Sequence, residues 1–174
     1  MNVLEILHDK VKKAVEKRTA LAEAIKCNEL SIDGLSTLSG LTDKDLVIIL
    51  EAMEEVSRSE PALSDMAWLA FAEKYVISDN NTLKREASRV IGNIAPLFAE
   101  QLGGLVSKLL ANSGNEGTVV RWGSGYALGR IILIPQYAKS DLYEKLTSIA
   151  ESEQENGVKN QYLAGLKKAK KIRC

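Results

Sequence analysis

The sequence predicts an all-α protein in which pairs of helices repeat along the chain. Apolar residues recur at intervals of three and four along almost its whole length, which is the spacing of amphipathic helices. No segment alternates apolar and polar residues between hairpin turns, so no pair of strands is expected. A two-helix unit recurs after 37 and 38 residues, in blocks that begin at Leu83, Val120 and Val158, and such a period is typical of an α-solenoid.

Local patterns indicate where the helices begin and end. The apolar spacing predicts a first helix over about residues 2–27. Thr42, with Asp45 three residues later, is a good N-cap for a helix that reaches about Arg58. Pro61 suits the first turn of the helix after that. Further helices are expected at about 31–39, 61–76, 82–95, 102–111, 117–133, 140–151 and 157–171.

Composition agrees with one globular domain over residues 1–174. The 174 residues are 45% hydrophobic, which excludes a disordered chain, and two cysteines are too few for a disulfide scaffold. No run of 18 apolar residues is present, so no membrane-spanning helix is expected. The unpaired cysteines and the absence of an unbroken apolar segment near the N-terminus predict a cytoplasmic protein.

The three repeat blocks carry a recognisable pattern. They read LKREASRVIGNI from Leu83, VRWGSGYALGRI from Val120 and VKNQYLAGLKKA from Val158. This pattern resembles the second helix of HEAT repeats, which is roughly V-R-x-x-A-A-x-A-L-G-x-I. The middle block matches best, and the third departs from the pattern at Tyr162 and Lys167, as a terminal capping repeat is expected to do.

The resemblance implies a right-handed α-α superhelix of about eight helices. It covers residues 61–174 as about three helix-pair repeats, and residues 1–60 would be N-terminal capping helices. It also implies that one face of the second helices lies on a concave surface that holds partners. At about 100° per residue, that face carries Arg85, Arg89, Asn93, Trp122, Tyr126, Arg130, Asn160, Ala164 and Lys168.

This predicted face combines aromatic and basic side chains, the types that dominate binding hot spots. The candidate partner-binding residues are Arg85, Arg89, Asn93, Trp122, Tyr126, Arg130 and Lys168. A second interpretation of Trp122 is that it packs under a neighbouring helix. Gly123 also has two interpretations, since it can serve close helix packing or let a partner approach the backbone beside Trp122.

The second position of each block is basic, namely Lys84, Arg121 and Lys159. The resemblance implies a structural ladder, in which this side chain pairs with an acid or amide in the turn of a neighbouring repeat. Ligand binding by the same residues is the alternative.

No catalytic, cofactor-binding or metal-binding residue is assigned. His8 is the only histidine, so neither a metal site nor a nucleophile–histidine site can be assembled convincingly. Carboxylate-only catalysis stays open, although Glu54 and Glu55 are expected to lie on a solvated face.

These observations favour a non-catalytic adaptor or scaffold module that binds a protein or acidic peptide segment on its concave face. The alternative is a nucleic-acid-binding protein similar to the HEAT-like alkylpurine DNA glycosylases, whose catalytic acid cannot be placed on this chain. A subunit of a hetero-oligomeric lyase or chaperone is a third hypothesis, and the oligomeric state is left open. The net charge of zero divides into −5 over residues 1–78 and +5 over residues 79–174, which keeps an anionic partner possible at the C-terminal half.

Overall fold

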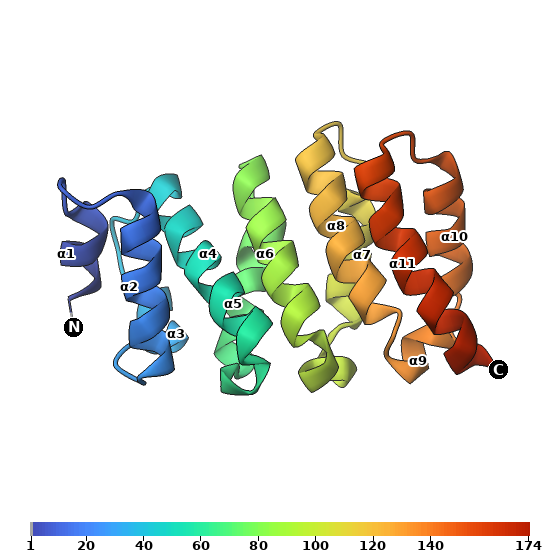
Figure 1. Ribbon diagram of the computed structural model, residues 1–174, viewed down its shortest axis with the longest axis horizontal. Coiled ribbons are helices and arrows are strands. Elements are labelled where there is room, and N and C mark those ends of the chain that lie inside the picture. The colour runs from blue at the N-terminus through green and yellow to red at the C-terminus, as the bar shows by residue number, and fades with distance from the viewer. Residues whose placement is uncertain (1) are drawn as a thin grey trace.

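The computed structural model describes residues 2–174, and within them every regular element is a helix (Figure 1). The α-helices are α1 (Val3–His8), α2 (Ala14–Lys26), α3 (Ile32–Ser36), α4 (Asp43–Ser59), α5 (Met66–Val76), α6 (Asn81–Ile94), α7 (Gly103–Asn112), α8 (Thr118–Ile131), α9 (Pro135–Ala138), α10 (Leu142–Ser152) and α11 (Asn156–Arg173). Two 3₁₀ segments, η1 (Pro61–Leu63) and η2 (Ala95–Gln101), join α4 to α5 and α6 to α7. The all-α prediction is confirmed, but the described residues form eleven α-helices where about eight were expected.

The first expected helix is interrupted, because a side chain caps the backbone in its middle. Asp9 accepts hydrogen bonds from the N–H groups of Val11 and Lys12, at 2.8 and 3.3 Å, so α1 ends and the chain turns. The prediction of one helix over residues 2–27 was therefore wrong. Asp65 has the same effect on the expected helix at 61–76, since it accepts from the N–H groups of Ala67 and Trp68 and makes α5 begin at Met66.

The N-terminal cap of α4 lies where the sequence indicated it. Thr42 and Asp45 form a capping box at the start of α4, in which each side chain accepts from the other residue's N–H group. Asn80 caps α6 by accepting from the N–H groups of Thr82 and Leu83.

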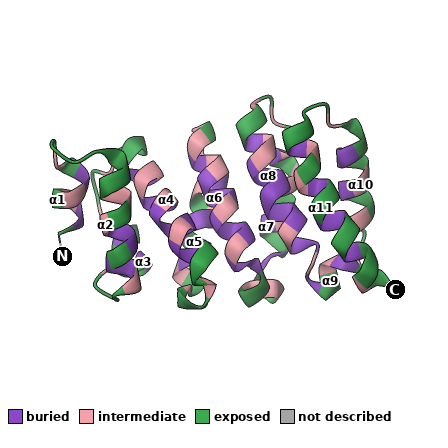
Figure 2. Ribbon diagram, in the orientation of Figure 1, coloured by how far each residue is buried: buried purple, intermediate pink, exposed green. Residues whose placement is uncertain are grey.

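The helices stand in two rows along the long axis of the molecule (Figure 1). In one row α2, α4, α6, α8 and α11 each pack against the next, and in the other α3 contacts α5 and α5 contacts α7. The rows are joined by the pairs α5–α6, α7–α8 and α10–α11. Buried residues line the interior between the rows (Figure 2), and they form one continuous apolar core from Val3 to Ala169.

Equivalent repeat positions meet at two successive helix junctions. A Cβ added to Gly92 of α6 would lie 3.0 Å from Cα of Ala127 in α8, and Gly129 of α8 in turn lies directly against Gly165 of α11. In both junctions the tenth position of one block contacts the eighth position of the next. The sequence repeat is therefore also a repeat of contacts.

Gly123 serves helix packing. It is buried, and a Cβ at this position would lie 3.0 Å from Cα of Arg85 in α6. The interpretation that Gly123 leaves room for a partner was wrong, because the helix next to α8 already occupies that space.

Both cysteines are exposed free thiols and lie near opposite ends of the molecule, Cys27 after α2 and Cys174 at the C-terminus (Figure 1). None of the helices in residues 2–174 has the length and apolar character needed to cross a bilayer.

Candidate binding groove

Three adjoining cavities form a groove across α4, α6 and α8. The Trp122 cavity, of about 440 Å³, is lined by Trp122, Val119, Arg85 and Glu51 among others. The central cavity, of about 140 Å³, shares Glu51 and Arg89 with it. The Arg130 cavity, of about 490 Å³, adjoins the central cavity at Arg58.

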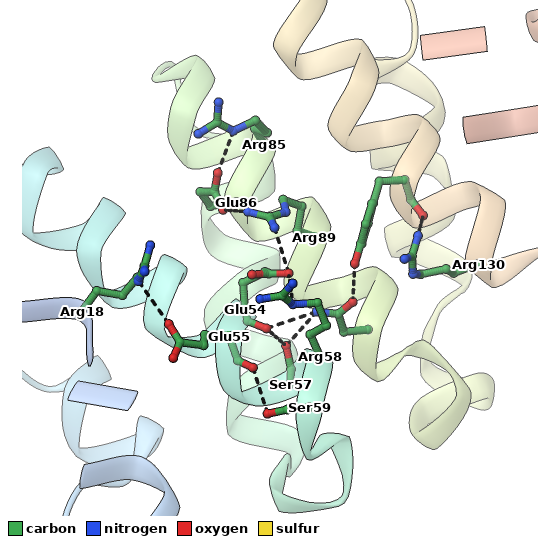
Figure 3. A network of polar contacts seen from close by, with 12 residues as sticks. Arg18, Glu54, Glu55, Ser57, Arg58, Ser59, Arg85, Glu86, Arg89 and Arg130 are labelled. Atoms are coloured by element: carbon green, nitrogen blue, oxygen red, sulfur yellow. Dashed lines mark hydrogen bonds and ion pairs between the residues drawn. The ribbon is translucent and has the colours of Figure 1, made fainter. Parts of the chain in front are cut away.

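A network of ion pairs forms the floor of the groove (Figure 3). Glu86 is 1% exposed and is held by Arg85 Nε at 2.6 Å and by Arg89 Nη1 at 2.7 Å. Arg89 also places Nη2 2.9 Å from Glu54 Oε1, so one guanidinium joins carboxylates of α6 and α4. Arg58 approaches the same Glu54 oxygen with Nε at 3.4 Å.

The expectation that Glu54 and Glu55 are solvated was wrong for Glu54. Its side chain is 5% exposed, because Arg89 and Arg58 converge on it. Glu55 is half-buried and pairs with Arg18 Nε of α2 at 3.1 Å.

Tyr126 is buried under the groove and holds α8 against α6. Its hydroxyl donates to Asn93 Oδ1 at 2.7 Å, and the Asn93 amide donates in turn to Ser57 Oγ of α4 at 3.1 Å. Burial raises the pKa of Tyr126, and the neighbouring positive charge of Arg130 opposes that change. Tyr126 and Asn93 are therefore parts of the framework of the groove, more than surfaces that a partner would touch.

Two side chains flank the Tyr126 ring and carry the accessible chemistry of the groove. The Arg130 guanidinium stacks on the ring, with Cζ 3.4 Å from the centroid, and its Nη1 donates to the Tyr126 carbonyl. Trp122 lies with its ring centroid 5.5 Å from that of Tyr126, and it is half-buried. The indole thus packs against the core and also lines the cavity, and partner binding by Trp122 stays a prediction.

The structure brings together six of the seven candidate residues. Arg85, Arg89, Asn93, Trp122, Tyr126 and Arg130 all line the groove or lie beneath it. Lys168 lies exposed on α11 and lines none of the three cavities.

The three basic residues of the expected ladder differ from one another. Arg121 places Nε 2.9 Å from Glu153 Oε2 and donates to the carbonyls of Asn115 and Glu116 in the turn before α8. Lys84 and Lys159 are half-buried and make no ion pair within the described residues.

The acidic half of the groove was missed by the sequence interpretation. Glu51, Glu54 and Glu86 supply its carboxylates, and burial followed by repulsion from Glu86 raises the pKa of Glu51. The signal that was present is the helical spacing of opposite charges, with Glu86 three residues before Arg89 and Glu54 four residues before Arg58.

Neither the groove nor the rest of residues 2–174 holds three or more His, Cys, Asp or Glu side chains grouped as metal ligands would be. Comparison of the chain with protein-family models, with curated proteins and with solved structures finds no match. The function of the groove is therefore inferred from the side chains that line it.

Proposed function

We propose that this protein is a non-catalytic interaction module with the right-handed α-α superhelix of HEAT repeats. The support is the contact repeat, in which the tenth position of one block meets the eighth of the next at both the α6–α8 and α8–α11 junctions. A superhelix stacks equivalent units with equivalent contacts, and such molecules bind partners along an extended face. The two exposed thiols suit a reducing compartment such as the cytoplasm.

The occupant of the groove is a segment of a partner protein. The observation that carries this proposal is the combination, in one groove, of a half-buried Trp122, the 41% exposed Val119 and arginines already held in place by buried carboxylates. Tryptophan and arginine are enriched among residues that dominate binding energy. Side chains that are ordered before binding lose less conformational entropy when the partner arrives.

The ion pairs favour a protein segment over a nucleic acid. Arg18, Arg85 and Arg89 each contact a glutamate, and so does Arg58. Binding of a nucleic acid depends mainly on uncompensated positive charge that can replace counterions along the phosphates. Within the groove most of that charge is already offset.

The test selects peptides from a phage-displayed random library on the full chain and maps the winners by ¹H–¹⁵N NMR. We expect the selected peptides to shift amide signals along α6 and α8 and to bind Trp122→Ala at least tenfold more weakly. Leu163→Ala is the matched control, since it truncates a 45% exposed apolar side chain on α11. Arg89 is unsuitable for this test, because its removal would take away the one cation that the buried Glu54 and Glu86 share.

Equal binding to the Trp122→Ala variant, or signal changes confined to other faces, would overturn the assignment of the groove. A salt titration with duplex DNA separates the nucleic-acid alternative. If the groove bound DNA through about 5 phosphate contacts, a plot of the logarithm of the binding constant against the logarithm of the salt concentration would have a slope of about −4.5. We expect no measurable binding of the DNA.

A further inference from the structure

We infer that the Arg130 cavity is the subsite for an acidic side chain of the partner segment together with the apolar residue beside it. This inference rests on the proposed function and assigns chemistry to one end of the groove. It follows from a difference among the arginines of the groove.

Arg130 is the arginine of the groove that lacks a carboxylate. Within the described residues no Asp or Glu oxygen lies within 4.0 Å of its guanidinium, whereas Arg18, Arg58, Arg85 and Arg89 each have one. A guanidinium has five N–H donors, and the structure engages Arg130 through one bond, from Nη1 to the Tyr126 carbonyl at 3.3 Å. Its charge and most of its donors are therefore left for a ligand.

Arg58 faces the same cavity from α4 and is also incompletely used. Its side chain is 62% exposed, and its Nε lies 3.4 Å from Glu54 Oε1. Two guanidinium groups from different helices thus border one cavity, and their positive charge is not fully neutralised by carboxylates, so they can bind an anion. Arginine binds carboxylates through paired N–H donors, which matches the planar shape of that ligand.

Most of the remaining lining of the cavity is apolar and stiff, and its two polar side chains, Ser57 and Asn93, are hydrogen-bonded to each other. Pro61, Pro96, Pro135, Leu133 and Ile134 line it. A free phosphate or a sugar would leave these walls without a partner. A carboxylate next to an apolar side chain satisfies both parts, because the carboxylate meets the arginines while the apolar group covers the prolines.

The geometry points to an acidic side chain within a continuing segment. Arg58 lines both the Arg130 cavity and the central cavity, so the two spaces adjoin and a chain can run on toward Trp122. The stacking of Arg130 on Tyr126 fixes the guanidinium before a ligand arrives. The partner segment is therefore expected to place its acidic residue at the Arg130 end of the groove.

The experiment uses three synthetic peptides and the ¹⁵N-labelled full chain. The probe is acetyl-Leu-Glu-Leu-amide, and its matched control is acetyl-Leu-Gln-Leu-amide, which has the same shape without the charge. The third peptide, acetyl-Leu-Gln-Leu with a free C-terminus, carries its only carboxylate at the chain end. Titrations follow the side-chain Nε–H signal of Arg130 and the backbone amides of Asn93 and Ile134.

We expect the glutamate peptide to shift these signals and to bind about tenfold more tightly than its glutamine control. Arg130→Gln and, separately, Arg58→Gln should each remove most of that difference, whereas Lys168→Gln on α11 should leave it unchanged. Arg58→Gln is the safer variant for folding, since its side chain is largely in solvent.

Equal affinity for the glutamate and glutamine peptides would overturn the inference, as would a difference that survives both arginine variants. Preferential binding of the free-acid peptide would overturn it in favour of a chain terminus. If library-selected peptides still map to the groove while the charge preference is absent, the subsite alone is wrong. If no peptide binds the groove, the proposed function fails with it.

Discussion

Gly165 of α11 lies so close to Gly129 of α8 that a Cβ on Gly165 would overlap the Gly129 carbonyl oxygen. A Cβ on Gly129 would in turn lie 2.5 Å from the carbonyl oxygen of Gln161. The neighbours are backbone atoms, which cannot rotate away. The two helices can approach this closely only because both positions lack side chains.

Gly165→Ala is expected to lower the free energy of unfolding by about 3 kcal/mol, since overpacking against fixed backbone is costly. Gly157→Ala is the matched control in the same helix. Apart from its chain neighbours and the adjoining backbone of its own helix, no heavy atom lies within 4 Å of its added Cβ, so the substitution should be neutral or should stabilise by about 0.5 kcal/mol. Urea unfolding followed by circular dichroism measures both, and similar values for the two variants would contradict the close-packing account.

Arg121→Met is expected to destabilise the protein by about 2–3 kcal/mol. The Arg121 side chain is 18% exposed, its guanidinium pairs with the carboxylate of Glu153, whose side chain is 6% exposed, and it donates to two turn carbonyls. Lys84→Met and Lys159→Met occupy the equivalent repeat positions without ion pairs, and each should change stability by less than about 0.5 kcal/mol. Equal losses at all three positions would show that the basic repeat position acts in some way other than through the Glu153 contact.

Stability should fall in acid through Glu153. Burial by itself would raise the pKa of this carboxyl, but the hydrogen bonds from Arg121 and from the Glu155 N–H outweigh burial and lower it below the ordinary 4.5. A carboxyl whose pKa is lowered in the folded state contributes its full stability at pH values above its unfolded-state pKa. That contribution is lost as the pH falls through the folded-state pKa. Glu153→Gln should therefore be less stable than wild type at pH 7, and the gap should narrow below about pH 4. A gap that is constant over this range would contradict the ion-pair account.

Glu51→Gln should act in the opposite direction. Burial, and then the charge of Glu86, raises the pKa of Glu51 above the ordinary 4.5, so ionised Glu51 opposes folding at neutral pH. A raised carboxyl pKa does not change the free energy of unfolding at pH values below the pKa of the unfolded state, and it lowers that free energy most at pH values above the pKa of the folded state. The variant should therefore be more stable than wild type at pH 7 and equal to it at about pH 3. A loss of stability at pH 7 would mean that the Glu51 carboxylate has a stabilising partner.

Two buried serines offer a comparison of hydrogen bonding at constant shape. The Ser124 hydroxyl in α8 is fully buried without a hydrogen-bond partner among the described residues, whereas Ser88 Oγ in α6 donates to the Lys84 carbonyl at 2.8 Å. Ser124→Ala should stabilise the protein by about 1 kcal/mol, because an unsatisfied polar group is removed. Ser88→Ala should give less benefit or a small loss, and thermal unfolding of the two variants shows the order.

Much of the helical framework was predictable, because its signals are local. The capping box at Thr42 and Asp45 is complete within four residues, and so is the cap at Asn80. The failure between α1 and α2 also has a local cause. Asp9 was counted as a polar position of one long helix, but its carboxylate competes for the N–H groups of Val11 and Lys12.

The groove was predictable only in part, since helical spacing shows which residues share a face and not what stands opposite. Arg85 and Arg89 were placed correctly on one face of α6. Their main partners include Glu54 of α4, which lies outside the recognised repeat blocks. The distance from α6 to α4 depends on packing of the whole row, so the Arg89–Glu54 ion pair between these helices could not be read from spacing.

The two exposed cysteines are natural attachment sites for a pair of dyes. A donor and an acceptor dye attached to Cys27 and Cys174 would report the end-to-end distance of the row of helices by resonance energy transfer, with no added mutation. A row held together by contacts between neighbouring helices can bend at every junction, so small rotations sum along its length. A ligand that joins α4, α6 and α8 would stiffen two of those junctions at once, α4–α6 and α6–α8. The distribution of the measured distances would then become narrower when the groove is filled. The same labelled protein would therefore report the elasticity of the row of helices as well as ligand binding.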